Sequence, residues 1–251
     1  MRKRNNFLLL PVLLLFVLPV YAQTVDELIE KNLNAHGGLA KLKEIQSMRM
    51  TGKMTLHQGM EAPIVFQKKR PHFIRIEFTV GGVTGIQAYD GRTAWAQMPF
   101  MGIKDAQKMP QEEAEDLIEE ADFDGPLVDY KQKGHTVELL GKEDVEGSEA
   151  YKLKLTLRDG KVRYIYLDAE TGLEVKLTSI IKREGIENSV DTFFSDYKEV
   201  EGLIFPFAFQ VKLKDQPGPQ YILDKVELNP QLDDSLFQMP AAVPQTQPAG
   251  R

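Results

Sequence analysis

The chain has 251 residues, of which 42% are hydrophobic and 27% charged, a balance typical of a globular protein with a sizeable core. It contains no cysteine, which excludes disulfides, thiolate metal sites, a cysteine nucleophile and a lipid-modified cysteine. The net charge of −6 argues against a general nucleic-acid binder. None of the four histidines has a metal-ligand spacing, so we expect neither a metal nor a cofactor.

Residues 1–22 have the pattern of a secretory signal peptide. Three basic residues precede an apolar run over 7–20, which is shorter than the ~20 residues of a membrane span. Val20-Tyr21-Ala22 fits a signal-peptidase site, so we expect cleavage after Ala22 and an exported, periplasmic protein that begins at Gln23. Losing three cations would take the net charge from −6 to −9. The alternative is an uncleaved membrane anchor.

Two helices are predicted at the start of the mature chain. Thr24 and Glu27 form a T-x-x-E capping box, in which each side chain accepts from a backbone N–H of the first turn. Apolar residues then recur at helical spacing until Gly37-Gly38, and a second short helix is expected over 39–45.

From Ser47 onward the period of the apolar residues changes from 3.6 to 2, which predicts half-buried antiparallel strands. Asp90-Gly91, Asp159-Gly160 and Thr171-Gly172 are the clearest turns, and Gly81-Gly82 is interpreted as a turn because no helix follows it to hold a phosphate. The predicted strands are 47–56, 64–68, 74–78, 83–89, 93–98, 135–140, 150–157, 162–167, 173–182, 189–197, 204–213 and 221–228.

The alternation of apolar and polar residues stops between Met98 and Met109, which we interpret as a loop. Pro110 suits the first turn of a new helix. That helix has an apolar stripe and an otherwise acidic surface. Its acidic side is either a solvated face or a docking surface for a basic partner. We predict that the loop and this helix form a mobile lid over a cavity, because they concentrate adaptable side chains.

These elements predict one α+β domain over 23–240, mostly antiparallel β, followed by a disordered tail over 241–251. A long antiparallel sheet must close, split into layers or curl around something. We favour curling around the helices, because both helical segments carry an apolar stripe that needs a partner.

No catalytic motif is present. The chain lacks a G-x-S-x-G elbow, H-E-x-x-H, a P-loop and G-x-G-x-x-G. Nothing in the sequence selects a pair of carboxylates for glycoside hydrolysis. We therefore do not expect an enzyme, and a hydrolase ranks only third among the possible functions.

Methionine and aromatic residues suggest where an apolar ligand would bind. Unbranched thioethers adapt to varied apolar ligands, although simple core packing is the alternative explanation. Strand alternation places Ile74, Ile76 and Phe78 on one face. The candidate lipid-binding residues are Met50, Met54, Ile74, Ile76, Phe78, Trp95, Phe100 and Met101.

The order of elements resembles the LolA-like family of periplasmic carriers that sort outer-membrane lipoproteins. The resemblance covers about Thr24 to Leu228 and depends on a capped helix followed by a strand and on later hairpin motifs. These motifs are Tyr151-Lys-Leu-Lys-Leu155, Tyr164-Ile-Tyr-Leu-Asp168, Thr171-Gly-Leu173 and Asp196-Tyr-Lys-Glu-Val-Glu-Gly-Leu-Ile-Phe-Pro206.

The resemblance implies a LolA/LolB-like half-open β-barrel of about eleven strands, curled over helices that line or plug an apolar cavity. It implies a carrier that holds the acyl chains of lipoproteins or related lipids and ferries them between membranes, with membrane-bound donor and acceptor proteins as partners. We expect a monomer. The alternative is a non-carrier interaction module of the envelope, in which the helices fill the barrel. The resemblance assigns no individual residue.

Overall fold

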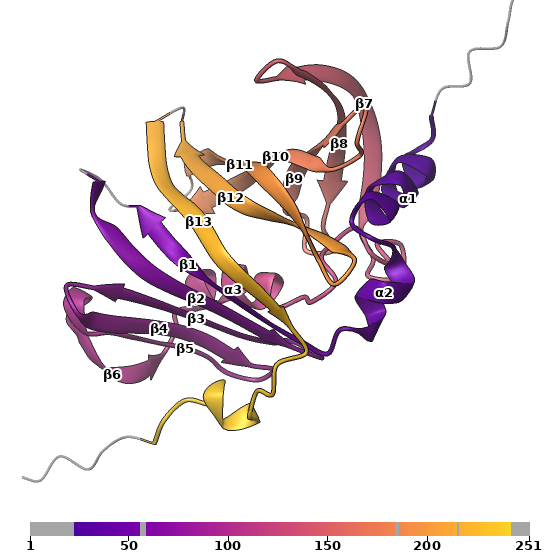
Figure 1. The fold of residues 1–251 in the computed structure, drawn as a ribbon. Helices are drawn as coiled ribbons and strands as arrows, with labels where there is room; N and C mark the ends of the chain where they lie inside the picture. The colour runs from indigo at the N-terminus through magenta and orange to yellow at the C-terminus, as the bar shows by residue number, and fades with distance from the viewer. Residues whose placement is uncertain (1–22, 56–58, 184–185, 215, 242–251) are drawn as a thin grey trace, which may run out of the picture.

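A single continuous antiparallel sheet of thirteen strands, strongly curved and unclosed, forms most of the molecule (Figure 1). The structure is a computed structural model that describes residues 23–55, 59–183, 186–214 and 216–241. The predicted signal peptide, Leu56 at the end of the first predicted strand and residues 242–251 of the predicted tail lie outside these ranges.

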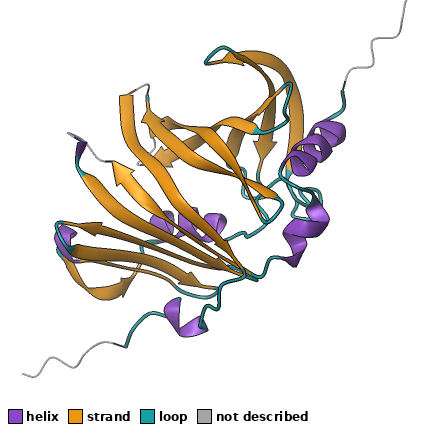
Figure 2. Cartoon of the chain, in the orientation of Figure 1, coloured by secondary structure: helices purple, strands orange, loops and turns teal. Residues whose placement is uncertain are grey.

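Helices make up a small part of the described chain (Figure 2). They are α1 (Val25–Ala35), α2 (Leu39–Glu44) and α3 (Gln111–Glu120). The strands are β1 (Ser47–Thr55), β2 (Glu61–Lys69), β3 (Phe73–Val80), β4 (Val83–Asp90), β5 (Ala94–Met98), β6 (Ile103–Lys108), β7 (Thr136–Val145), β8 (Ser148–Thr156), β9 (Val162–Asp168), β10 (Glu174–Arg183), β11 (Ile186–Val200), β12 (Leu203–Leu213) and β13 (Gln216–Leu228).

The sheet is a meander in two arms that meet where β1 pairs with β13. Its strand order is β6-β5-β4-β3-β2-β1-β13-β12-β11-β10-β9-β8-β7. The first arm runs outward from β1 to the edge strand β6, and the second runs inward from the edge strand β7 to β13. The predicted half-open, α+β architecture is therefore confirmed.

The number of strands differs from the expected eleven or so, because the sheet has thirteen. The strand that the sequence pattern did not reveal is β6, which lies within the predicted loop Met98–Met109 and pairs with β5. Its sequence, IKDAQK, alternates weakly because an edge strand has one side in water and tolerates charges on both faces.

Helix α1 begins at the predicted capping box. The Thr24 hydroxyl accepts from the Glu27 amide at 3.3 Å, and the Glu27 carboxylate accepts from the Thr24 amide at 2.8 Å. The helix ends where Gly37, at φ +103°, passes close to the β11–β12 turn. A Cβ on Gly37 would lie 2.3 Å from the carbonyl oxygen of Gly202, so only glycine permits this contact.

The convex side of the first arm is covered by the segment that follows β13. The fully buried Trp95 donates its indole N–H to the carbonyl of Phe237 at 2.8 Å. The ring of Phe237 also stacks on Phe73, with 5.4 Å between the ring centroids. This outer face is therefore part of a packed core.

Candidate functional site

The concave face of the sheet is defined by strand register. Met50 in β1 pairs with Phe66 in β2, which pairs with Ile76 in β3. Residues paired across antiparallel strands point to the same face of the sheet. Ile74 lies two residues from Ile76 in β3 and therefore points to the same face as Met50. Leu117 of α3 packs against Ile74, so α3 covers this face.

Helix α3 lies on the concave side of the first arm and reaches the second arm through side-chain ion pairs. Its apolar stripe packs on the first arm, where Leu117 contacts the cluster around Ile74. Its acidic side faces the second arm, where Glu119 forms an ion pair with Arg163 at 2.8 Å and Glu115 with Lys161 at 3.2 Å. Part of the predicted acidic surface therefore forms ion pairs within the molecule, between α3 and the second arm.

Helix α1 covers the concave side of the second arm. Leu28 and Ile29 of the helix belong to one buried cluster with leucine and isoleucine side chains of β8 and β9. These partners are Leu153, Leu155, Ile165 and Leu167. Each arm therefore has its own helix, and the strands at the centre of the sheet lie between the two.

A ribbon of aromatic side chains crosses these central strands. Tyr221 in β13 pairs with Met54 and with Phe209, and Phe209 pairs with Phe194 in β11. Successive ring centroids are 6.3 Å apart from Phe66 to Tyr221, 5.5 Å to Phe209 and 6.4 Å to Phe194. All four rings are only half-buried, so the ribbon is an apolar wall that helices α1 and α3 do not seal.

The concave face is more exposed at the end of β12 than at its start, although Phe205 near the start is half-buried. Leu203 is 3% exposed and Phe207 is 6% exposed, Phe209 is half-buried, and Leu213 at the end of the strand is 46% exposed.

The concave face of β3 also becomes more exposed along the strand, because Ile74 is fully buried whereas Ile76 and Phe78 are half-buried. We call the end at the β3–β4 and β12–β13 turns the open end and the opposite end the closed end. The difference is seen in β3 and β12 only, because Met54, Ala62 and Ile64 of β1 and β2 are buried at the open end.

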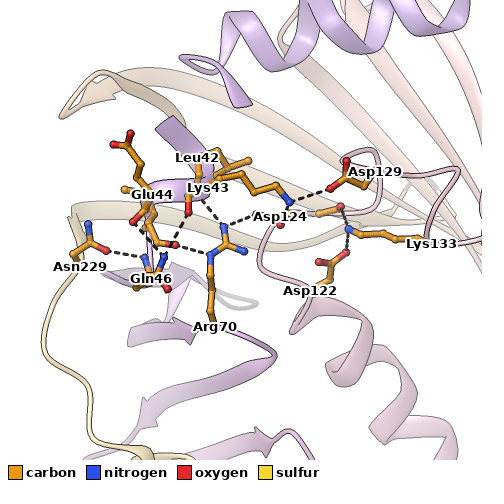
Figure 3. Close-up of polar contacts among 12 residues, drawn as sticks. Leu42, Lys43, Glu44, Gln46, Arg70, Asp122, Asp124, Asp129, Lys133 and Asn229 are labelled. Carbon is orange, nitrogen blue, oxygen red and sulfur yellow. Dashed lines mark hydrogen bonds and ion pairs between the residues drawn. The ribbon is translucent and has the colours of Figure 1, made fainter. Parts of the chain in front are cut away.

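Polar contacts fasten the closed end, where α2, the end of β2 and the α3–β7 connection meet (Figure 3). Arg70 donates to the carbonyls of Ile45 at 2.7 Å and Leu42 at 3.1 Å, and to the carboxylate of Asp124 at 2.5 Å. Lys43 donates to Asp124 at 2.7 Å as well. These bonds fix the connection after α3 to α2 and to the first arm, and Phe123 of the connection packs against Leu203 of the second arm.

The pKa values of three groups reflect these surroundings. Burial by itself raises the pKa of Asp124, but the hydrogen bonds from Arg70 and Lys43 outweigh it and hold that pKa below its usual range. Burial raises the pKa of Glu119 despite its cationic neighbours. Burial, together with the charge of Glu120 on α3, raises the pKa of Tyr221.

Most of the candidate residues from the sequence share the concave side. Met50, Met54, Ile74, Ile76 and Phe78 are brought to one face by the register. Phe100, in a short 3₁₀ helix over 99–101, reaches the same face, because its ring lies 5.6 Å from that of Phe78 and would collide with a Cβ on Gly85.

Two candidates lie elsewhere. Trp95 was expected on the cavity wall but is on the convex side, buried against Phe237, because the C-terminal segment folds back over the outside of the first arm. Met101 is 67% exposed at the β5–β6 tip. The prediction of a loop over 98–109 was wrong, since this segment is a hairpin that continues the sheet, and its role as a lid stays a prediction.

The aromatic ribbon was missed by sequence reasoning. Its four rings come from β2, β11, β12 and β13, so only the pairing of β1 with β13 brings them together. The usable signal was the alternation in Leu203-Ile-Phe-Pro-Phe-Ala-Phe209, which places Phe205, Phe207 and Phe209 on one face.

No group of three or more histidine, aspartate or glutamate side chains among the described residues is arranged to hold a metal ion. None of the helices of the described chain has both the length and the apolar character needed to cross a membrane.

Solved structures with the same fold are available for comparison. A DUF1329 family protein from Desulfovibrio piger aligns with 85% of this chain and 97% of its own, at a TM-score of 0.60 and 14% identity. A LolA superfamily protein from Nitrosomonas europaea aligns with 86% of this chain and 98% of its own, at 0.56 and 15%. A putative outer-membrane lipoprotein-sorting domain from Vibrio parahaemolyticus aligns with 83% and 97%, at 0.55 and 12%.

These similarities define the fold of the chain as LolA-like, as the sequence motifs indicated. No protein-family model and no curated protein matches the sequence itself. The identities of 12–15% show a shared architecture and carry no assignment of individual residues.

Proposed function

We propose that the protein is a periplasmic carrier that binds the acyl chains of lipoproteins or related lipids on its concave face and ferries them between membranes. The observation that carries this proposal is the half-buried aromatic ribbon between α1 and α3. Large apolar side chains that remain in contact with water on the inside of a curved sheet favour a ligand that covers them. The Vibrio parahaemolyticus structure with this fold is described as a putative outer-membrane lipoprotein-sorting domain.

Binding by such a face is reversible burial and involves no covalent step. Each methylene that leaves water contributes about 0.8 kcal/mol, so an acyl chain lying along the ribbon gains affinity with its length. The proposed contacts are Phe66, Phe194, Phe209 and Tyr221, together with Met50, Met54, Ile76, Phe78 and Phe100. A carrier of this kind needs no catalytic group, and the predicted cleavage after Ala22 would deliver it to the periplasm.

Binding of a fluorescent fatty acid to the purified full chain tests this proposal. We expect saturable binding that is weakened about tenfold or more in Phe209→Ala, which interrupts the ribbon. Phe193→Ala is the matched control, because Phe193 in β11 is also half-buried but lies on the convex side under Lys176 and Lys212. The control variant should bind the probe as tightly as the wild type.

Mass spectrometry of protein purified from a membrane-containing host gives a second readout. Co-purified acyl lipid in the wild type, reduced in Phe209→Ala, would support the carrier. No probe binding and no co-purified lipid would favour the interaction module with a filled barrel, and equal binding by the two phenylalanine variants would place the ligand elsewhere.

A further inference from the structure

A groove runs along one flank of helix α1. One wall is the helix between Asp26 and Asn34, the other is the segment 129–132 that precedes β7, and Leu39 of α2 also lines it. The volume of the groove is about 470 Å³. It shares no residue with the aromatic ribbon, so the groove is a separate site from the proposed lipid-binding face.

Apolar side chains make up part of the lining. Ile29 is 6% exposed, and Leu33 and Leu39 are half-buried. On the opposite wall, the half-buried Tyr130 packs against the same buried cluster as Leu33. A concave site with an apolar lining and a few polar groups at its edge is typical of a binding site, so the groove suits an apolar side chain.

The charged part of the lining is mostly acidic. Three carboxylates, those of Asp26, Glu30 and Asp129, line the groove together with one lysine, Lys131. Asp26 pairs with Lys131 at 2.7 Å, and Asp129 pairs at 3.0 Å with Lys43, which lies outside the lining and is shared with a second carboxylate. Glu30 is exposed and has no ion pair among the described residues. The groove therefore favours a cation over an anion.

Lys131 shows how the groove holds a cation. Its Nζ lies 2.7 Å from the Asp26 carboxylate and 5.3 Å from the centre of the Tyr130 ring. The Tyr130 hydroxyl donates to the same carboxylate at 2.8 Å. The side chains of Asp26 and Lys131 are 63% and 66% exposed, and exposed ion pairs contribute little to stability. A cation from a partner can therefore replace Lys131 at small cost.

We infer that this groove is a docking site for an extended segment of a partner protein, in which an apolar side chain is flanked by lysine or arginine. The apolar side chain would contact Leu33 and Tyr130, and the cation would bind Glu30 and Asp26. The wall from Asp26 to Asn34 is about 12 Å long, which matches about four residues of extended chain. A flat lipid surface does not enter a groove, and the phosphates of a nucleic acid have the wrong charge. The inference does not depend on the proposed carrier function.

Fluorescence anisotropy of a labelled peptide with the purified full chain tests this inference. The probe is the peptide Gly-Lys-Leu-Arg-Leu-Lys-Gly. One control peptide has glutamate in place of the basic residues, and the other has serine in place of the leucines. We expect saturable binding of the probe, and binding weaker by about tenfold or more for each control peptide.

Two substitutions at exposed positions test the groove itself. Glu30→Lys places a like charge where the cation of the peptide would bind, and Asn34→Trp fills part of the groove. Each should weaken binding of the probe by about tenfold or more, with thermal unfolding like that of the wild type. Glu113→Lys, at an exposed position of α3, is the matched control, because it changes the net charge by the same amount. It should bind the probe like the wild type.

Three results would overturn the docking site. They are no saturable binding of the probe, equal binding of either control peptide, or an equal loss in Glu30→Lys and Glu113→Lys, which would indicate a general attraction to an acidic protein. A dimer that Asn34→Trp abolishes would assign the groove to a second copy of the chain instead. Binding of the fluorescent fatty acid reports separately on the proposed function, and both groove variants should retain it.

Discussion

The two ends of the curved sheet are built from opposite chemistry. At the closed end, Arg70, Lys43 and Asp124 bind together segments that are distant in the sequence, and the apolar residues between them are buried. At the open end, four of the hairpin tips carry an exposed apolar side chain, namely Met60, Val83, Met101 and Leu213. The same strands therefore fix the architecture at one end and leave a surface to be covered at the other.

This difference has a physical reason. The closed end joins both arms to α2 and to the connection after α3, and directional hydrogen bonds define such a junction better than apolar contacts alone. A surface that must receive and release an apolar ligand gains from the opposite arrangement, because a fully packed wall would leave no room for the ligand. Four expected outcomes test this contrast, from the largest effect to the smallest.

The largest effect is expected for Arg70→Ala. The substitution removes one donor from two carbonyls and from the half-buried Asp124 carboxylate, which keeps its hydrogen bond from Lys43. It also removes the guanidinium that lies 4.4 Å from the centre of the Phe123 ring. We expect a loss of about 3 kcal/mol in the free energy of unfolding, measured with denaturant. Arg92→Ala, at an exposed turn position, should change it by less than about 0.5 kcal/mol. A similar loss in both variants would contradict the special role of the closed end.

Along β12, two phenylalanines test the decrease in burial. Phe207→Ala should cost about 3–4 kcal/mol in denaturant unfolding, because it leaves a cavity in a packed cluster. Phe209→Ala, two residues closer to the open end, should cost about half as much, since water or ligand can fill the space. Equal losses would show that the concave face is a filled core at both positions.

The dependence of stability on pH is expected to change in Asp124→Asn. The folded-state pKa of Asp124 is lower than its ordinary value of 3.8, so its ionised form stabilises the fold above that pH. This contribution is lost as the pH falls through the lowered pKa. The wild type should therefore be more stable than Asp124→Asn at pH 7, and the two should converge below about pH 4. If the difference in unfolding free energy between the two proteins stayed constant over this pH range, the effect of the substitution would come from altered packing and hydrogen bonding instead of the lost charge.

The smallest effect is expected in hydrogen exchange. Amides in 98–109 should exchange faster than those of β1 and β13, because this hairpin is at the edge of the sheet. Bound lipid should slow their exchange if the hairpin and α3 form a lid. Equal exchange with and without lipid would remove the lid role and leave an ordinary edge hairpin.

Local sequence patterns determined the start of the first helix, most of the strands and the clearest turns. The capping box at Thr24 and Glu27, the alternation in the strands and the turn at Asp90-Gly91 depend on residues a few positions apart, and each is found in the structure. The one strand that escaped detection is β6, because a short edge strand with charges on both faces has no clear alternation.

Only the tertiary structure decided which face of each strand became the inside. Alternation divides a strand into two faces but does not say which one will be concave, and for Trp95 the answer depends on Phe237, which is 142 positions away. The aromatic ribbon has the same origin, because Phe66 and Tyr221 come together only when β13 pairs with β1. Sequence periodicity is a local property, whereas the curvature and closure of a sheet are set by contacts between its most distant parts.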